Sequence, residues 1–453
     1  MRPTLAGIAL ALVGLLLRDL ASADGQQWWL VAAGLAIAVC EQAARVLLPT
    51  GRWLLRALRT LVEAFPADDD ARNGGQLIAD VLRGHGVKHI FTLCGGHIST
   101  VLVGCKAKGI AVVDTRHEAT AVFAADAMYR LTGVVGAAAV TAGPGVTNTV
   151  TAVKNAQMAQ SAVIIVGGAA TTVTQGRGAL QDVEQLAIFR PVTKWATSVR
   201  CTGDLQPTLQ RALHVAREGV PGPVFVEVPI DLLYPFAMVS AEYYGKSEPR
   251  SLQQKLVRRY LSYRLALTFS GGLDSHPRLC APLPVRPLPP SGRAVAKTAE
   301  RLSRATKPVL LLASQAVDGG PGRAQRLAAS VDRLGIPCYL QGMARGALGA
   351  RHPLLLRHKK TDCTKVADFI LLGGVVCDFR LNYGRSLSSK AYKCAVNRDR
   401  TGLHMNSDIV PRDLSIHADV LTFLEALADH MEAEAAVGAK GTGKAKLLSS
   451  GRE

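Results

Sequence analysis

Residues 111–131 read AVVDTRHEATAVFAADAMYRL, and their pattern indicates the fold class. Its apolar start predicts a short strand over residues 111–114, and residues 119–131 predict an apolar helix. A short polar loop, residues 115–118, joins the two. A strand, a short loop and a helix form the repeating unit of an α/β domain, in which helices cover both faces of a parallel sheet.

The same unit recurs on both sides of this stretch. A helix is predicted over residues 76–84, and short apolar strands are predicted over residues 89–93, 135–142, 162–167 and 223–228. Helical segments separate these strands, as expected for a mostly parallel sheet. We therefore predict a first α/β domain over residues 70–240.

A second α/β domain is predicted over residues 293–432. Its helices are predicted over residues 293–304 and 322–334, and its strands over 308–313, 337–340, 368–373 and 392–397. The predicted fold class is therefore α/β, with two doubly wound, mostly parallel-sheet domains that follow an N-terminal hydrophobic anchor.

Two further segments lack the α/β pattern. Residues 241–292 contain many prolines and are interpreted as a linker with one helix near residues 260–269. Residues 433–453 are rich in Ala, Gly, Lys and Ser and show no apolar periodicity. We predict that this tail is disordered.

The N-terminal residues 1–65 carry a membrane or targeting signal. Two apolar runs, residues 5–17 and 28–40, are each shorter than the roughly 20 residues that cross a bilayer. The small residues 21–23 after the first run suit a cleaved signal peptide, whereas the two runs together suit a hairpin. Arginines after the second run favour an uncleaved anchor in the endoplasmic reticulum membrane with the globular part in the cytosol. A mitochondrial presequence is the alternative, because acidic residues are sparse before Asp68.

Composition narrows the class of partner and the compartment. The net charge is +18, but aromatic residues make up only 5% of the chain and the basic residues are dispersed, which argues against nucleic acid. Anionic small molecules or an acidic membrane surface account for the charge better. The nine cysteines are scattered without a C-x-x-C pair, as expected for free thiols in a reducing compartment.

Three loops follow predicted strands of the first domain, at the edge of the sheet where ligands bind. They are Gly95-Gly96-His97, residues 115–118 and residues 142–148. The third loop nearly matches the dinucleotide fingerprint G-x-G-x-x-G, but Asn148 stands where the last glycine should be. This departure argues against a nicotinamide site and favours a tight turn from strand to helix.

Glu118 allows two interpretations from its position alone. A carboxylate at the start of a helix is stabilised by the helix dipole, so Glu118 could simply cap the helix. A buried carboxyl at the end of a strand could instead have a raised pKa and take part in proton transfer. The sequence leaves both open.

Six motifs in the same order resemble those of thiamine-diphosphate enzymes. The first is Arg116-His117-Glu118 followed by residues 124–133, with Ala127 where most relatives have glycine. The others lie at residues 141–148, 180–182, 189–194, 222–224 and 229–231. The residues 95–99 and the N-terminal apolar runs are most similar to acetolactate synthase-like proteins of the membrane-anchored 2-hydroxyacyl-CoA lyase type.

The resemblance implies a cofactor, a substrate class and site residues. Glu118 would hydrogen-bond the aminopyrimidine ring of thiamine diphosphate and promote the tautomer that activates the thiazolium carbon. Gly95, Gly96 and Asn148 would contribute to cofactor binding. His97 and Gln181 would line the substrate side, although a plain surface turn explains His97 equally well. The expected reaction is cleavage of a 2-hydroxy fatty acyl-CoA to a shortened aldehyde and formyl-CoA.

The family's Mg²⁺ site carries a Gly-Asp-Gly motif followed by an asparagine, and this sequence contains no Gly-Asp-Gly. We therefore expect the Mg²⁺ ligands to lie outside this chain and the chain alone to be inactive. Family active sites lie between two subunits, so we expect a homo-oligomer or a hetero-oligomer with a full-length relative. A non-catalytic partner subunit and an acetolactate synthase-type carboligase are the alternatives.

The central domain of the family holds FAD or ADP, or has only a structural role. Here its candidate loops are Gly342-Met343-Ala344-Arg345-Gly346 and Cys377-Asp378-Phe379-Arg380. Arg345, Arg380 and Arg385 could meet phosphate groups, although solvated surface arginines are the preferred interpretation.

Overall fold

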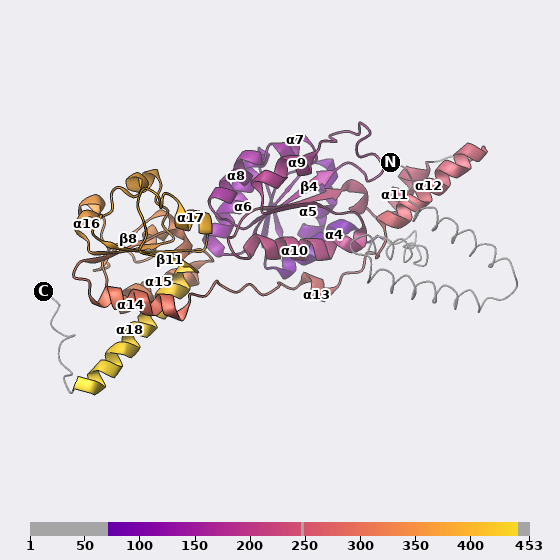
Figure 1. Ribbon diagram of the computed structural model, residues 1–453. Helices are drawn as coiled ribbons and strands as arrows, with labels where there is room; N and C mark the ends of the chain where they lie inside the picture. The colour runs from indigo at the N-terminus through magenta and orange to yellow at the C-terminus, as the bar shows by residue number, and fades with distance from the viewer. Residues whose placement is uncertain (1–70, 246–248, 443–453) are drawn as a thin grey trace, which may run out of the picture. The chain divides into compact units, whose positions relative to one another are not determined.

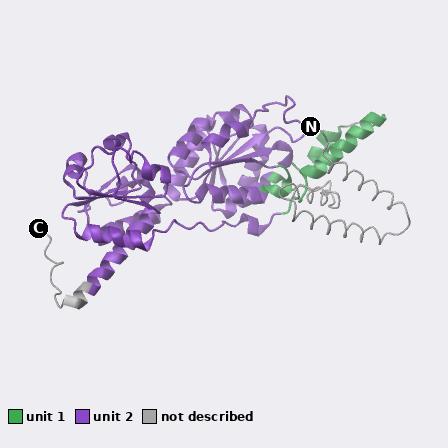
Figure 2. Cartoon of the chain, viewed as in Figure 1, with its two compact units in different colours: residues 1–74, 200–205, 234–274 green, residues 75–199, 206–233, 275–453 purple. Residues whose placement is uncertain are grey.

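The computed structural model describes residues 71–245 and 249–442 (Figure 1). The chain divides into two compact units (Figure 2). One unit comprises residues 1–74, 200–205 and 234–274, and the other comprises residues 75–199, 206–233 and 275–453. Both parallel sheets lie in the second unit, whereas residues 70–74, 200–205 and 234–240 of the first predicted domain belong to the first unit.

The first α/β domain contains a six-stranded parallel sheet with the order β2-β1-β3-β4-β6-β5. Its strands are β1 (His89–Leu93), β2 (Ala111–Asp114), β3 (Gly136–Val140), β4 (Val163–Ala169), β5 (Trp195–Ser198) and β6 (Val224–Pro229). The sequence predicted every strand but β5. This edge strand is only half-buried along its length and therefore lacks the continuous apolar run of the buried strands.

Helices flank this sheet. They are α4 (Gly74–Gly84), α5 (Ser99–Ala107), α6 (Glu118–Thr132), α7 (Pro144–Thr147), α8 (Val150–Met158), α9 (Gln185–Phe189) and α10 (Leu205–Arg217). The helices α6 and α8 pack on β1, β3 and β4 and form one core with them.

The helix α6 has defined signals at both ends. At its start the ring nitrogen Nδ1 of His117 accepts a hydrogen bond from the backbone N–H of Ala119, at 3.1 Å. At its end Gly133 adopts a left-handed conformation, with φ of 75°. These signals fix Glu118 as the first residue of the helix, directly after the loop that follows β2.

The central domain contains a five-stranded parallel sheet with the order β11-β10-β9-β7-β8. Its strands are β7 (Pro308–Leu312), β8 (Cys338–Leu340), β9 (Phe369–Gly373), β10 (Tyr392–Asn397) and β11 (Leu414–His417). Its helices are α14 (Gly292–Ser303), α15 (Pro321–Leu334), α16 (Lys360–Val366), α17 (Arg400–His404) and α18 (Val420–Thr442). The prediction of two α/β domains with parallel sheets is thus confirmed.

The segments outside the sheets differ from the sequence prediction. The predicted linker contains α12 (Leu252–Thr268) and α13 (Pro277–Cys280), and α11 (Phe236–Tyr244) begins before it. The helix α12 starts eight residues before residue 260 because Ser251 and Gln254 form a capping box. The helix α18 continues past residue 432 to Thr442, since this alanine-rich stretch has high helix propensity.

The predicted anchor, residues 1–65, lies outside the described residues. Within residues 71–245 and 249–442, the structure has no helix that is both long enough and apolar enough to span a membrane. Residues 443–453 of the predicted tail also lie outside the described part of the chain.

Candidate functional site

The three predicted loops lie side by side at the carboxyl edge of the first sheet. Strand β1 stands between β2 and β3, so the loops that follow these three strands are neighbours. These loops carry residues 95–97, Glu118 and Asn148. The fold therefore gathers residues from three separate motifs at the edge where parallel sheets bind ligands.

Glu118 is buried, with only 6% of its surface exposed. Its carboxylate oxygen Oε2 accepts a hydrogen bond of 3.0 Å from the side-chain amide Nδ2 of Asn148. The carboxylate also lies at the N-terminal end of α6, where the helix dipole favours negative charge. The capping position and the burial that the sequence left as alternatives therefore occur together, and Asn148 is the residue that orients the carboxylate.

Thr141, which the sequence analysis quoted only as part of a motif, is the point where two of these loops meet. A Cβ atom at Gly95 would lie 2.4 Å from Cβ of Thr141, and a Cβ atom at Gly145 would lie 2.6 Å from its Cγ2. The position at Gly145 is also 3.5 Å from Oε1 of Glu118. Only glycine at residues 95 and 145 allows the two loops to approach Thr141 this closely.

Gly96 differs from these two glycines. A Cβ atom at this residue would meet no atom of the described residues within 4 Å, and its φ angle is one that other residues adopt. Packing within the chain therefore does not require glycine here. The space where a side chain at residue 96 would begin is open, and it lies at the carboxyl edge of the sheet.

His97 lies at the edge of the site and packs beside Thr141. Its ring nitrogen Nδ1 is 3.3 Å from the hydroxyl oxygen Oγ1 of Thr141. Its Cβ atom occupies the space that a side chain at Gly168 would need, because a Cβ atom there would lie 2.5 Å from it. Partial burial lowers the pKa of His97, so the neutral imidazole is favoured near neutral pH.

Gln181 lies against the third loop through its backbone. It adopts a left-handed conformation, with φ of 60°, and a Cβ atom at Gly143 would lie 2.8 Å from its carbonyl oxygen. The loop that carries Gln181 therefore packs on the turn after β3.

Gln185 and Glu227 form a buried support under the same turn. Oε1 of Gln185 accepts a hydrogen bond of 2.9 Å from the backbone N–H of Gly143. Its Nε2 donates to Oε2 of Glu227 at 2.7 Å and to the carbonyl oxygen of Gly168 at 3.1 Å. This pair was not predicted from the sequence, although a glutamate inside the buried strand β6 was a signal for it.

The predicted loops of the central domain gather positive charge. Arg380 forms a salt bridge of 2.6 Å with Asp378. Burial, and then the charges of Arg345 and Arg380, lower the pKa of Lys360. Asp378, which pairs with Arg380, acts in the opposite direction and raises the pKa of Lys360. Within the described residues, no group of three or more His, Cys, Asp and Glu side chains is placed to hold a metal ion.

Two comparisons with known families decide the identity of these domains. Residues 72–188 match the family described as thiamine pyrophosphate enzyme, N-terminal TPP binding domain. Residues 295–427 match its central domain. This chain belongs to the thiamine-diphosphate enzyme family. Glu118, Asn148 and the loop glycines all lie in the N-terminal domain of that family.

The relatives separate into two levels of similarity. The chain is 51% identical to human 2-hydroxyacyl-CoA lyase 2 over 365 residues, which cover 80% of this chain and 57% of that protein. It is 51% identical to the 2-hydroxyacyl-CoA lyase 2 of Danio rerio over 354 residues, or 78% and 56% of the two chains. A Mycobacterium tuberculosis acetolactate synthase large subunit, IlvG, is 32% identical over 326 residues, or 72% and 53%. The chain thus spans a little more than half the length of the curated relatives it matches.

Proposed function

We propose that this chain is the pyrimidine-binding part of a thiamine-diphosphate-dependent 2-hydroxyacyl-CoA lyase. The substrate would be a 2-hydroxy fatty acyl-CoA, and the products a shortened aldehyde and formyl-CoA. The observation that carries the proposal is the buried Glu118 carboxylate held by Asn148 at the carboxyl edge of the sheet. The identity of about 50% to 2-hydroxyacyl-CoA lyases supports the choice of substrate.

The residues at this edge fit the aminopyrimidine ring of the cofactor. The Glu118 carboxyl is the group that would hydrogen-bond the ring and exchange a proton with it, and the amide of Asn148 keeps that carboxyl in one orientation. The space beside the Cα atom of Gly96, where another residue would carry its Cβ atom, leaves room for a planar ring to approach. When bound, thiamine diphosphate supplies the electron sink for cleavage of the bond beside the 2-hydroxyl carbon.

The remaining site residues would act on the substrate side. His97 is held neutral beside Thr141 and would serve as a hydrogen-bond partner for the 2-hydroxyl group or the thioester. Gln181, in the loop packed on Gly143, would line the same space. In the central domain, the cations Arg345, Lys360 and Arg380 would hold the phosphates of ADP or FAD.

Assembly and location follow from the same proposal. The chain would act as a homo-oligomer, or with a full-length relative that supplies Mg²⁺ and the diphosphate site. The N-terminal apolar runs would attach it to the endoplasmic reticulum membrane with the globular part in the cytosol, with the mitochondrion as the rival location. A carboligase that forms acetolactate is the second candidate activity, because the chain is 32% identical to an acetolactate synthase subunit.

A complementation assay tests the proposal. Human 2-hydroxyacyl-CoA lyase 2 would be made inactive by Gln at the glutamate aligned with Glu118, and then mixed with this chain, Mg²⁺, thiamine diphosphate and a 2-hydroxyacyl-CoA. This chain would also be assayed alone. Formyl-CoA and aldehyde are measured by mass spectrometry, and native mass spectrometry reports whether mixed oligomers form.

We expect both products in at least one arm and their loss when this chain carries Glu118→Gln. Acetolactate formed from pyruvate, without formyl-CoA from the acyl-CoA, would replace the lyase by the carboligase. If mixed oligomers form and neither arm gives a Glu118-dependent product, the proposal is wrong.

A further inference from the structure

The helix α12 carries an exposed apolar stripe that the proposed function does not use. Leu252, Leu256, Tyr260 and Tyr263 are 75%, 61%, 47% and 42% exposed. Their spacing of four, four and three residues places them on one side of the helix. An exposed row of large apolar side chains marks a surface that binds a partner or a membrane.

A different side of α12 packs on its own unit. Leu265 is fully buried, and Phe269, directly after the helix, meets the ring of Phe236 edge-on at 5.2 Å between centroids. The hydroxyl of Tyr244 donates to Oγ of Ser262 at 3.0 Å. The helix is therefore anchored through its C-terminal half, and its exposed stripe is additional to the face that folding uses.

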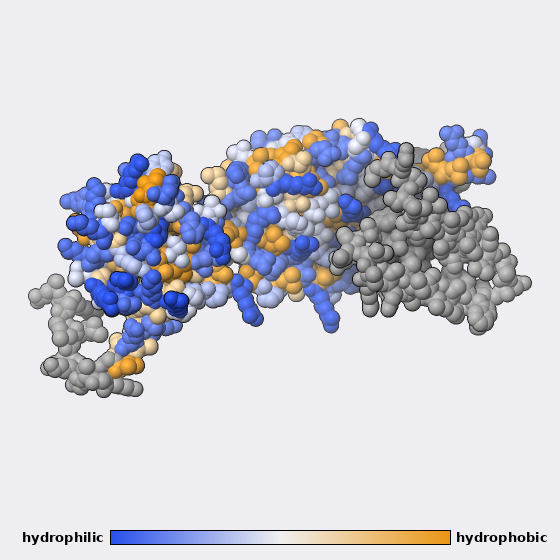
Figure 3. All heavy atoms as spheres, in the orientation of Figure 1, coloured by the Kyte–Doolittle hydropathy of each residue, from blue (hydrophilic) through white to orange (hydrophobic). Residues whose placement is uncertain are grey.

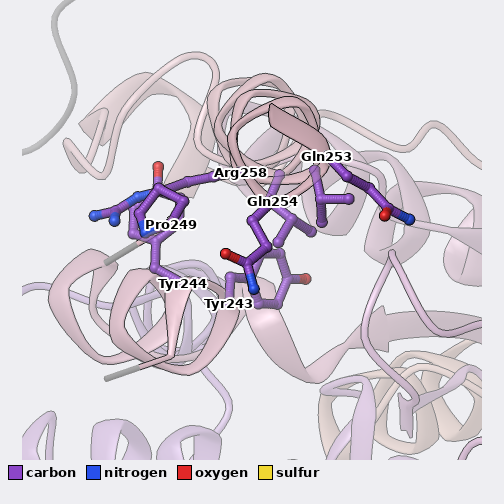
Figure 4. A pocket seen from close by; sticks show the side chains of 8 residues that line it. Tyr243, Tyr244, Pro249, Gln253, Gln254 and Arg258 are labelled. Atoms are coloured by element: carbon purple, nitrogen blue, oxygen red, sulfur yellow. The ribbon is translucent and has the colours of Figure 1, made fainter. Parts of the chain in front are cut away.

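Among the described residues, α11 does not cover the N-terminal half of α12. A pocket of about 510 Å³ separates the two helices. Figure 4 shows Tyr243 and Tyr244 on the α11 side and Gln254 and Arg258 on the α12 side of this space. The guanidinium of Arg258 lies 5.0 Å from the ring centroid of Tyr244. The two helices thus touch at this point and do not close over the exposed stripe.

The charge of α12 indicates what covers the stripe. The helix contains basic residues and no acidic residue along its length. Lys255 and Arg259 are exposed and flank the stripe formed by Leu252, Leu256 and Tyr260. Figure 3 shows hydrophobic and hydrophilic residues next to each other on α12. Basic side chains beside leucine and tyrosine are typical of helices that lie in the interface of an anionic membrane.

We propose that α12 is a membrane-docking helix, with its stripe of Leu252, Leu256, Tyr260 and Tyr263 inserted among anionic phospholipids. The apolar side chains would enter the headgroup boundary, and the long basic side chains would extend to the phosphates. Each cation near an anionic membrane contributes on the order of a fivefold gain in partition. This contact would be separate from any attachment through residues 1–65.

The test uses the full chain, and a residue-level measurement separates α12 from residues 1–65. Vesicles of phosphatidylcholine, with or without phosphatidylserine, would carry a photoactivatable acyl chain. Cross-linked peptides are then identified by mass spectrometry. The variant pair Leu256→Glu with Tyr260→Glu is compared with Val366→Glu, a matched control because Val366 is 65% exposed on α16 in the central domain.

We expect lipid cross-links within residues 252–263, at least fivefold more with phosphatidylserine, and at least a tenfold loss in the double variant only. Lys255→Gln with Arg259→Gln should remove the dependence on phosphatidylserine. Circular dichroism and a thermal melt report whether the variants fold. Cross-links confined to residues 1–65, or protection of α12 from hydrogen exchange by a second copy without vesicles, would overturn the proposal.

Discussion

The two parallel sheets of this chain end in loops of opposite chemical character. The carboxyl edge of the first sheet holds a buried carboxylate, Glu118, among glycines that bring backbone segments close together. The corresponding edge of the central sheet holds the cations Arg345, Lys360 and Arg380. The same architecture therefore presents a buried carboxylate in one domain and a group of cations in the other, because the loops and not the sheet determine the side chains at this edge.

The largest effect is expected from Glu118→Gln. The amide cannot exchange a proton as the carboxylate does, so turnover of a 2-hydroxyacyl-CoA should fall by about 10²–10⁴-fold. The measurement is formyl-CoA release per active site in the complementation assay described above. Asp114→Asn is the control, since it removes a carboxylate just four residues away whose side chain is 55% exposed. An equal loss of turnover in both variants would mean that Glu118 contributes no more to the reaction than an exposed carboxylate does.

The glycines of the first edge give the next largest effect. Gly95→Ala places a methyl group against Thr141 and should lower the free energy of unfolding by about 1–3 kcal/mol in urea denaturation. Gly96→Ala is the matched control at the neighbouring residue and should leave stability unchanged. If Gly96→Ala nevertheless weakens thiamine diphosphate binding, the open space at Gly96 is where the ligand lies. Equal destabilisation by both variants would contradict the loop geometry.

The sequence predicted most of the backbone because the buried strands are continuous apolar runs. Every residue of β4 is buried, and its boundaries were predicted to within two residues. The strands β5 and β11 are partly exposed and contain serine, so hydrophobicity alone did not reveal them. The start of α12 was missed for a related reason, since a capping box and not an apolar face begins that helix.

The spacing of residues along the chain identified a site residue only where a single segment carries the signal for it. Glu118 was identified as the first residue of a helix after a strand. Its hydrogen bond to Asn148 joins residues 30 positions apart, and the bond between Gln185 and Glu227 joins residues 42 positions apart. Such pairs depend on the order of strands in the sheet, which the spacing of residues along the chain does not specify.

The buried support of the first edge is tested by Gln185→Leu. Leucine fills a similar volume but leaves the N–H of Gly143 and the carboxylate of Glu227 without their partner. Unpaired buried groups cost about 1–3 kcal/mol, so we expect a loss of about 2 kcal/mol in urea denaturation. Gln175→Leu, at an exposed residue, is the control and should change stability little. A loss below about 0.5 kcal/mol would mean that water replaces the side chain.

The smallest effect is expected at the second edge. ADP at about five times its Kd should stabilise the chain by about 1 kcal/mol, read as a thermal shift, and Lys360→Gln should remove the shift. Arg351→Gln, at an exposed residue of the same domain, should retain it. Because burial, Arg345 and Arg380 lower the pKa of Lys360, the ammonium of Lys360 should lose its proton at a lower pH than an ordinary lysine does. ADP affinity should therefore begin to fall at that lower pH.

A thermal shift that FAD and ADP produce but inorganic phosphate does not would mean that the domain recognises the adenosine as well as the charge. If none of the three ligands changes the melting temperature, the central domain does not bind them. The two sheet edges would then differ in charge but not in the ligand they bind.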